Sequence, residues 1–168
     1  STHSASGLIT QASCVPLATR IRIVAQIAEA VGAAHRVGVL HKDIKPSNIL
    51  IVPECKPQLA DFGVGAITDA QRLKNAGITM PTIVSQFTGS GADPVRTGTH
   101  LYMAPELLEG HTASLRTDIY ALGVLLYQMV RGELSSAIGF GWERDVPHEP
   151  LRQAIAACVD GDPSRRLA

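Results

Sequence analysis

The decapeptide His41-Lys42-Asp43-Ile44-Lys45-Pro46-Ser47-Asn48-Ile49-Leu50 decides the fold and holds most of the candidate functional groups. Within it, Asp43, Lys45 and Asn48 place a carboxylate, an ammonium and a carboxamide within six residues. Pro46 can neither continue a helix nor donate a strand hydrogen bond. These polar residues are therefore predicted to lie on a loop rather than inside a helix or a strand.

Two short stretches follow this loop, the first of them wholly apolar, and both are predicted to be strands. The first covers residues 49–52 and the second residues 57–60, with a turn between them. Asp61 comes directly after the second stretch, in Asp61-Phe62-Gly63. The polar groups are thus expected at the ends of a small β-hairpin, which fixes them more tightly than a free loop would.

These groups suit phosphoryl transfer to a hydroxyl. That reaction needs an acceptor for the hydroxyl proton, oxygen ligands for Mg²⁺, and a cation beside the transferred phosphate. We expect Asp43 to orient the hydroxyl and Lys45 to lie beside the γ-phosphate. Asn48 and Asp61 are the candidate Mg²⁺ ligands.

Three motifs carry a resemblance to the protein kinases. His41-Lys42-Asp43 with Asn48 resembles their catalytic loop, Asp61-Phe62-Gly63 their metal-binding triplet, and Ala104-Pro105-Glu106 the end of their activation segment. Lys45 is typical of the Ser/Thr-specific members. The resemblance implies an α+β fold, mainly α-helical with a small β-hairpin, that corresponds to the C-terminal lobe of a bacterial-type Ser/Thr kinase. It also implies ATP and Mg²⁺ as cofactors, with Mn²⁺ as a substitute, and a protein substrate with a Ser or Thr hydroxyl.

The resemblance assigns roles to further residues. It places Leu50 below the adenine ring, and it makes Gly98 to Glu106 a docking segment in which Thr99 bonds toward Asp43 and Lys45. The remaining assignments are structural and concern His41 packing under Phe62, Asp118 accepting backbone N–H bonds from the catalytic loop, and Glu106 pairing with Arg166.

The sequence predicts one partial kinase domain over residues 1–168, with the catalytic loop at 41–50, the activation segment at 61–106 and a central apolar helix at 118–130. A helix at 16–37 is expected to be buried on most sides, and a last helix is expected at 151–159. Residues 77–94 are predicted to form a long loop.

The charge balance and the length of the apolar runs give no support to a protein that binds nucleic acid or a membrane surface, or to one that spans a bilayer. The 168 residues contain 15 Lys plus Arg and 15 Asp plus Glu, so no charge excess favours a nucleic acid or a membrane surface. The longest apolar run, residues 119–129, is too short for a bilayer. Cys14, Cys55 and Cys158 show no metal spacing, and we expect free thiols in a reducing cytoplasm.

Two departures from the family pattern stand out. Lys42 replaces the usual arginine before the catalytic aspartate, and lysine cannot hold a phosphate in the bidentate way that arginine does. The motifs of the N-terminal lobe are absent from the residues before His41. We therefore expect a fragment that is inactive alone, with an exposed apolar surface where the other lobe or an upstream segment would bind.

Two alternatives stay open from the sequence. The chain could be a non-catalytic, kinase-like scaffold, although Asp43, Asn48 and Asp61 are all retained. It could also be a small-molecule phosphotransferase related to the kinases, although these enzymes generally lack the Gly98 to Glu106 segment.

Overall fold

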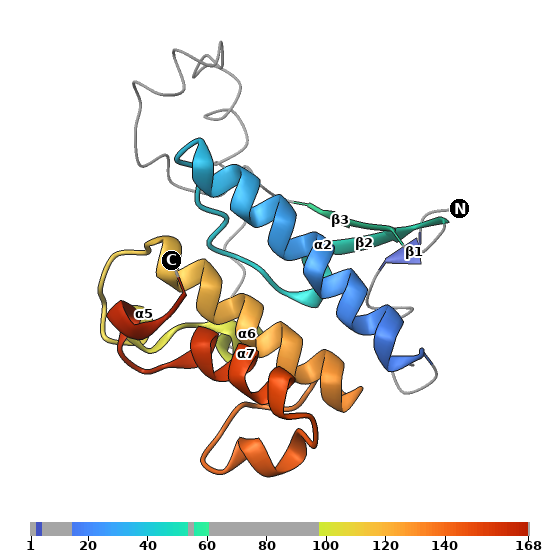
Figure 1. Ribbon diagram of the computed structural model, residues 1–168. Helices are drawn as coiled ribbons and strands as arrows, with labels where there is room; N and C mark the ends of the chain where they lie inside the picture. Colours follow the sequence, from blue (N-terminus) through green and yellow to red (C-terminus); the bar gives the residue numbers. More distant parts are fainter. Residues whose placement is uncertain (1–2, 5–14, 54–55, 61–97, 168) are drawn as a thin grey trace.

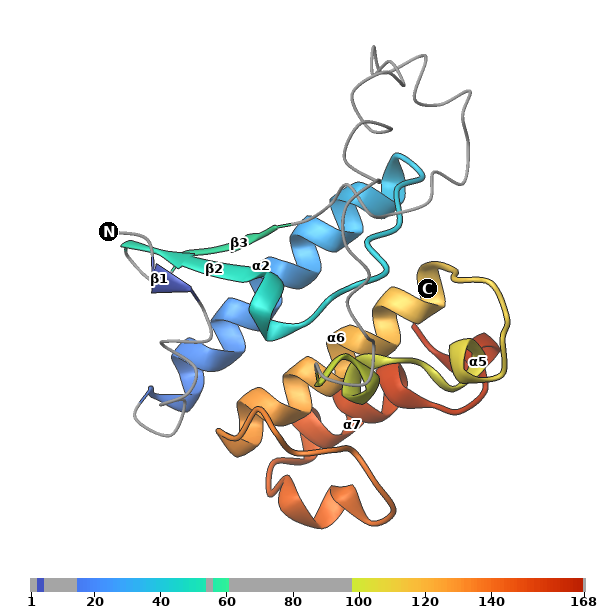
Figure 2. The same cartoon turned by 180° about the vertical axis from the view of Figure 1, so that it is seen from behind.

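The computed structural model describes residues 3–4, 15–53, 56–60 and 98–167. It is mainly helical, as the sequence predicted, and its small antiparallel sheet contains the predicted hairpin and a third strand that was not predicted. Figure 1 shows helix α6 (Leu115–Arg131) between α2 (Leu17–Arg36) and α7 (Glu149–Val159), and Figure 2 shows the same order from behind. Within the described ranges, no helix is long and apolar enough to cross a membrane.

Helix α2 confirms the predicted helix at 16–37 to within one residue at each end. Pro16 precedes its first turn, and Gly38 follows it in the left-handed conformation with φ of 77°. The predicted burial on most sides is wrong. Only one face is buried, formed by Ile23, Val24, Ile27 and Val31, whereas alanines such as Ala28 and Ala30 are exposed. Alanine contributes to an apolar pattern but has little surface to bury, so the pattern overstated the width of the buried face.

The sheet has the order β1-β2-β3, with β1 (His3–Ser4), β2 (Ile49–Val52) and β3 (Lys56–Leu59) all antiparallel to their neighbours. Strand β2 matches its prediction, and β3 starts and ends one residue earlier than predicted. Ile49 pairs with Leu59 and Val52 with Lys56. The Ala60 N–H still donates to the carbonyl of Asn48 at 2.7 Å, so the hairpin also ties the end of the catalytic loop to the residue before Asp61.

Helix α6 is the core of the molecule, as predicted, with Val124 and Leu125 fully buried. It begins at Leu115 rather than at the predicted Asp118, because Ser114 and Thr117 form a capping box that starts the helix earlier. It ends at Arg131, followed by Gly132 in the left-handed conformation with φ of 78°.

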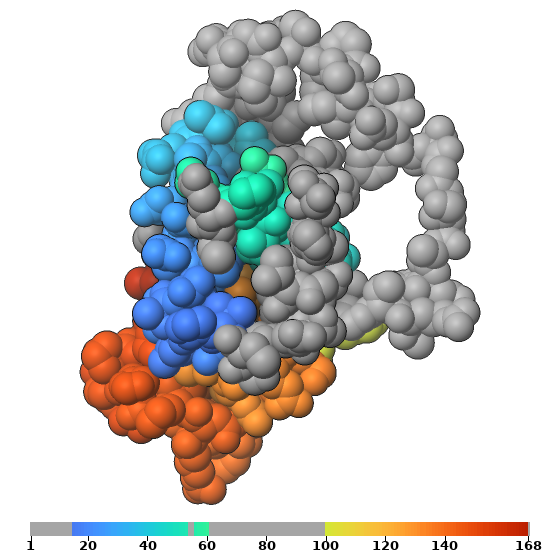
Figure 3. Space-filling model, turned by 90° about the vertical axis from the view of Figure 1, so that its right-hand side faces the viewer, coloured from blue at the N-terminus to red at the C-terminus, as the bar shows by residue number. Residues whose placement is uncertain are grey.

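Helix α7 crosses α6 at very close range. A Cβ added to Gly123 would lie 2.5 Å from Cβ of Cys158 and 2.6 Å from Cγ1 of Val159, so only glycine fits there. The helix starts at Glu149, two residues before the predicted start, because Pro150 suits the first turn. In the space-filling view of Figure 3, the orange C-terminal part lies below α2, which is blue.

Short helices complete the described chain. They are η2 (Pro46–Asn48), η5 (Gly98–Tyr102), α5 (Pro105–Leu108), η6 (Trp142–Asp145) and η7 (Pro163–Arg165). The predicted loop at 77–94 and most of the predicted activation segment lie outside the described residues.

Candidate active site

The catalytic loop, residues 41–50, follows α2 and contains η2, and its polar groups contact one another directly. The Lys45 ammonium lies 2.8 Å from Oδ2 of Asp43. Nδ2 of Asn48 donates to the same Oδ2 at 2.9 Å and to the Asp43 carbonyl at 2.8 Å. One carboxylate oxygen of Asp43 is therefore held by two donors, and its other oxygen, Oδ1, is the candidate acceptor for a substrate hydroxyl.

The amide of Asn48 has a defined orientation. Both of its hydrogen bonds to Asp43 use Nδ2, so Oδ1 is the atom available for ligation. A carbonyl oxygen is a suitable ligand for Mg²⁺, and this geometry fits the predicted role. Asp61, the second predicted ligand, lies outside the described residues. Among the residues that the structure describes, no group of three or more His, Cys, Asp or Glu could hold a metal ion.

Asp118 holds the backbone of the catalytic loop from helix α6. Its Oδ2 accepts from the His41 N–H and its Oδ1 from the Lys42 N–H, both at 2.8 Å. The resemblance predicted these two hydrogen bonds. Lys42 has a φ of 67°, a conformation that non-glycine residues seldom adopt, so the loop needs such external support. Asp118 is 1% exposed, and in the low-polarity interior its bonds to the loop are strong.

His35 is a third partner of Asp118 that the sequence analysis missed. Its Nε2 lies 2.8 Å from Oδ2 of Asp118. His35 sits in the last turn of α2, so this contact joins α2, the catalytic loop and α6 at one point. Nothing in the local sequence signals the contact, because the two residues are 83 positions apart.

His41 has the buried environment expected of a structural residue, with no exposed surface. Its Nδ1 lies 3.3 Å from the Asp43 N–H, which donates to it, and its Nε2 lies 3.0 Å from the Ala60 carbonyl. This pattern fits the tautomer with the proton on Nε2. Because both ring nitrogens bond to the backbone, His41 is a poor candidate for a general base. Phe62, its predicted packing partner, lies outside the described residues.

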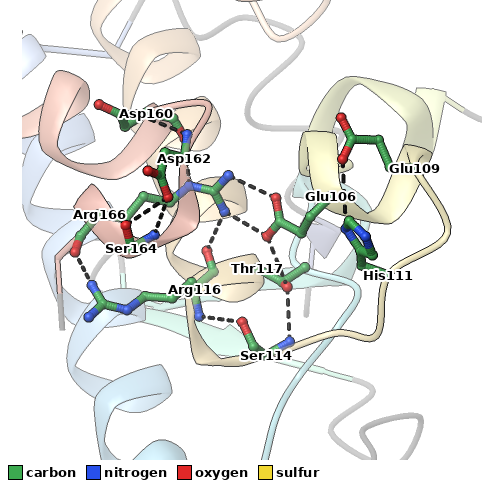
Figure 4. Close-up of polar contacts among 10 residues, drawn as sticks. All are labelled: Glu106, Glu109, His111, Ser114, Arg116, Thr117, Asp160, Asp162, Ser164 and Arg166. Atoms are coloured by element: carbon green, nitrogen blue, oxygen red, sulfur yellow. Dashed lines mark hydrogen bonds and ion pairs between the residues drawn. The ribbon is translucent and has the colours of Figure 1, made fainter.

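The docking segment, Gly98 to Glu106, is anchored at its end by an ion pair. Nη1 and Nη2 of Arg166 donate to Oε1 and Oε2 of Glu106 at 2.7 and 2.8 Å. Figure 4 shows the pair surrounded by Thr117 and Arg116 from α6. Thr117 donates to Glu106 at 3.3 Å, and the guanidinium of Arg166 also lies 4.9 Å from the centre of the Tyr120 ring.

Burial and hydrogen bonding have opposite effects on the pKa of the Glu106 carboxyl. Burial alone would raise the pKa of its carboxyl, but the bonds from Arg166, the Coulomb attraction of that guanidinium and the bond from Thr117 outweigh it. The net effect is a lowered pKa, so the carboxylate stays charged at neutral pH and keeps the ion pair.

The structure tests the two other predicted site residues only in part. Leu50 lies in β2, half-buried, opposite Gln58 of β3. Thr99 lies in η5. A contact of Leu50 with adenine and a bond of Thr99 toward Asp43 remain predictions.

Comparisons with known proteins agree with this geometry. The family model for the protein kinase domain matches residues 2–139. The Ser/Thr-protein kinase pkn3 of Myxococcus xanthus is 34% identical over 147 residues, which cover 79% of this chain and 24% of that protein. PkaA, a Ser/Thr-protein kinase of Streptomyces coelicolor, is 35% identical over 132 residues, covering 77% of this chain and 21% of PkaA.

A third relative, the probable Ser/Thr-protein kinase pknA2 of Bifidobacterium longum, is 29% identical over 152 residues, covering 86% of this chain and 17% of pknA2. The chain thus spans about a fifth of the length of these relatives. The family match covers the catalytic loop, the docking segment and all of α6. The chain therefore belongs to the protein kinase domain family, as a member of its bacterial Ser/Thr type.

Proposed function

We propose that this chain is the C-terminal lobe of a Ser/Thr protein kinase and transfers the γ-phosphate of ATP to a protein hydroxyl when the rest of the kinase is present. The observation that carries the proposal is the arrangement of Asp43, Lys45 and Asn48, on a loop whose backbone is fixed by Asp118. A carboxylate, a cation and a metal-ligating amide within bonding distance of one another are the groups that phosphoryl transfer requires.

Each residue has a distinct role in the proposed mechanism. Asp43 accepts the hydrogen bond of the substrate hydroxyl at Oδ1, orients its oxygen and takes its proton. Lys45 contacts Asp43 and would balance negative charge on the phosphate. Asn48 and Asp61 would hold Mg²⁺, and Leu50 would contact the adenine ring. When bound, Mg²⁺-ATP would supply the phosphoryl group, and its Mg²⁺ would supply positive charge beside that group.

The proposal includes a requirement for more of the chain. The sequence contains no motif that would cover the ATP phosphates, so we expect weak Mg²⁺-ATP binding and little turnover by these 168 residues alone. A cytoplasmic location and a Ser/Thr-containing protein substrate are parts of the same proposal.

The test compares Asp43→Asn with the unchanged full-length protein, using radiolabelled ATP, Mg²⁺ and casein as the acceptor. We expect at least about a hundredfold loss of transfer, because removing a positioned acid–base group costs on the order of 10²–10⁴. Asp145→Asn is the matched control. Asp145 lies in η6 and accepts bonds from Tyr127 and Arg131, at the opposite end of α6 from Asp118.

The same experiment separates the alternatives. Equal activity of the Asp43→Asn variant and the unchanged protein would contradict the mechanism. Calorimetry adds a second criterion, since Mg²⁺-ATP binding without any transfer would favour the non-catalytic scaffold. Transfer to an aminoglycoside but not to casein would favour the small-molecule phosphotransferase.

A further inference from the structure

Helix α2 has a polar contact with helix α6 at each of its ends. At one end, Nε2 of His35 lies 2.8 Å from Oδ2 of Asp118. At the other end, Nη1 of Arg20 donates to the carbonyl of Met129 and, at 3.3 Å, to the carbonyl of Val130. The start of α2 therefore lies beside the end of α6, and the two helices are antiparallel, as Figure 1 and Figure 2 show.

The two carbonyls that Arg20 contacts need a donor from outside their own helix. The last four carbonyls of a helix are left without the usual partner one turn further on. The Gln128 carbonyl accepts N–H groups from the residues that follow α6, whereas the carbonyls of Met129 and Val130 accept from Arg20. The guanidinium also places a positive charge at the negative end of the α6 dipole.

Arg20 uses only one end of its guanidinium for these contacts. Within the described residues, its buried Nε has no acceptor, and both bonds come from Nη1. A lysine ammonium carries three donors on one atom and can therefore serve both carbonyls. Arg20→Lys is thus conservative at this position, whereas Arg20→Met removes both bonds and keeps the apolar stem.

The far end of α2 leads directly to the catalytic loop. Arg20 and His35 are about 22 Å apart along α2, at a rise of about 1.5 Å per residue. Asp118 contacts His35 with the same Oδ2 that accepts the His41 N–H at 2.8 Å. A displacement of α2 along its axis therefore moves a partner of the carboxylate that holds the catalytic loop.

The two polar contacts define the position of α2 along α6 more narrowly than its apolar face does. The buried face of α2 resists separation of the helices, but apolar contacts are non-directional. Hydrogen bonds have preferred distances and angles, so a small slide of the helix weakens them at once.

We propose that Arg20 is a positioning residue, which fixes α2 along α6 so that His35 and the catalytic loop meet Asp118 in the geometry needed for transfer. Loss of Arg20 lowers kcat for phosphate transfer and speeds hydrogen exchange in the catalytic loop. The inference rests on the proposed function, because it assigns the transfer step to Asp43 on that loop.

Four substitutions in the full-length protein test the inference. Arg20→Met removes both bonds, Arg20→Gln is a milder loss that removes the positive charge, and Arg20→Lys is the rescue. Arg22→Met is the matched control, because Arg22 lies in the same helix but is exposed.

The first measurement is hydrogen exchange of the His41 and Lys42 amides, which donate to Asp118. A typical hydrogen bond corresponds to a factor of about five in a local equilibrium, so we expect about fivefold faster exchange in Arg20→Met. Arg20→Gln should give a smaller increase. Arg20→Lys and Arg22→Met should keep the rates of the unchanged protein.

The amides of Val124 and Leu125 separate positioning from general stability. These residues are fully buried in the middle of α6, and their amides exchange through global unfolding. A loss of stability alone speeds these core amides at least as much as the loop amides. A positioning effect speeds the loop amides more.

The second measurement is steady-state phosphorylation of casein with Mg²⁺-ATP. We expect kcat to fall about fivefold in Arg20→Met, with KM for ATP changed by less than about twofold, because the ATP-binding groups stay in place. Arg20→Lys should recover most of the kcat. A residue that contributes only to stability leaves kcat unchanged at temperatures at which the protein stays folded.

Each outcome decides the inference. Unchanged exchange at the two loop amides, or an increase no larger than that at the core amides, overturns it, because Arg20 would then act on stability alone. An equal effect of Arg22→Met, or faster exchange with an unchanged kcat, also overturns it. If the unchanged protein transfers no phosphate, the proposed function fails, and the exchange measurement alone still decides whether Arg20 positions the loop.

Discussion

Removing Arg166 should destabilise the protein far more than removing both members of its ion pair. Arg166 makes two bonds to Glu106, one to the Arg116 carbonyl at 3.0 Å and one to the Asp160 carbonyl at 2.7 Å. Its side chain has no exposed surface, and that of Glu106 is 10% exposed. An Arg166→Met substitution therefore leaves a buried carboxylate that keeps only weaker partners, such as Thr117 at 3.3 Å.

The expected magnitude follows from that unpaired charge. Breaking a buried pair by removing one partner costs about 3–5 kcal/mol, a large part of the roughly 5–15 kcal/mol that stabilises a typical domain. In the double variant Glu106→Gln/Arg166→Met no charge stays unpaired. We expect its free energy of unfolding to exceed that of Arg166→Met by about 1–3 kcal/mol, despite the additional substitution.

Urea unfolding measures these differences, and the fluorescence of Trp142, the single tryptophan of the chain, reports on them. Trp142 packs edge-on against Tyr127 at 6.0 Å, so its signal follows the core around α6. If the double variant loses as much stability as the sum of the two single variants, the pair contributes nothing as a pair and the reasoning is wrong.

The pH dependence of the same pair has a defined sign. The pKa of Glu106 is lowered in the folded protein, so the pair stabilises fully above the unfolded pKa of about 4.3 and this contribution is lost as the pH falls through the lower folded pKa. The stability difference between the unchanged protein and Glu106→Gln should therefore be constant from pH 6 to 8 and shrink below about pH 4. A difference that shrinks between pH 8 and 6 would contradict this assignment.

Three further substitutions test the fold and the support of the site. Gly123→Ala should cost about 1–3 kcal/mol by urea unfolding, because its Cβ would overlap Cys158, whereas Gly139→Ala, with open space around it, should be nearly neutral. Asp118→Ala should abolish most transfer to casein and speed hydrogen exchange in the catalytic loop, since two of its amides lose their acceptor; normal exchange there would contradict this role. Ser114→Ala should cost about 1 kcal/mol by removing the cap of α6, and a loss below about 0.3 kcal/mol would show that the capping box is not important.

Local sequence patterns predicted the elements well but not all of their limits. The helix at 17–36, the hairpin and the closing glycines Gly38 and Gly132 follow from periodicity and turn chemistry, which act over a few residues. The start of α6 was missed although Ser114 and Thr117 have the spacing of a capping box. The pattern of apolar residues began later than the helix, and the prediction followed that pattern alone.

Contacts between residues far apart in the sequence could be predicted only where the resemblance to the kinase family indicated them. The pairing of Glu106 with Arg166 and the bonds to Asp118 came from the resemblance, and the structure contains both sets of bonds. The contacts of His35 with Asp118 and of Gln128 with Tyr102 were missed, because no local rule relates residues 83 or 26 positions apart. Such contacts depend on how α2, α6 and the docking segment pack together.

Helix α6 gives these distant contacts a common physical basis. Asp118 accepts hydrogen bonds from the catalytic loop, and Gln128 accepts one from Tyr102 in the segment from Gly98 to Glu106. Both residues belong to one helix with a rise of about 1.5 Å per residue, so their Cα atoms are about 15 Å apart along its axis. The spacing between the two segments is thus set by a rigid element. A shift of the whole helix would move both anchors together and preserve that spacing. A Gln128→Met substitution removes the contact to Tyr102 and leaves Asp118 in place, so hydrogen exchange should become faster in residues 98–106 and stay unchanged in the catalytic loop.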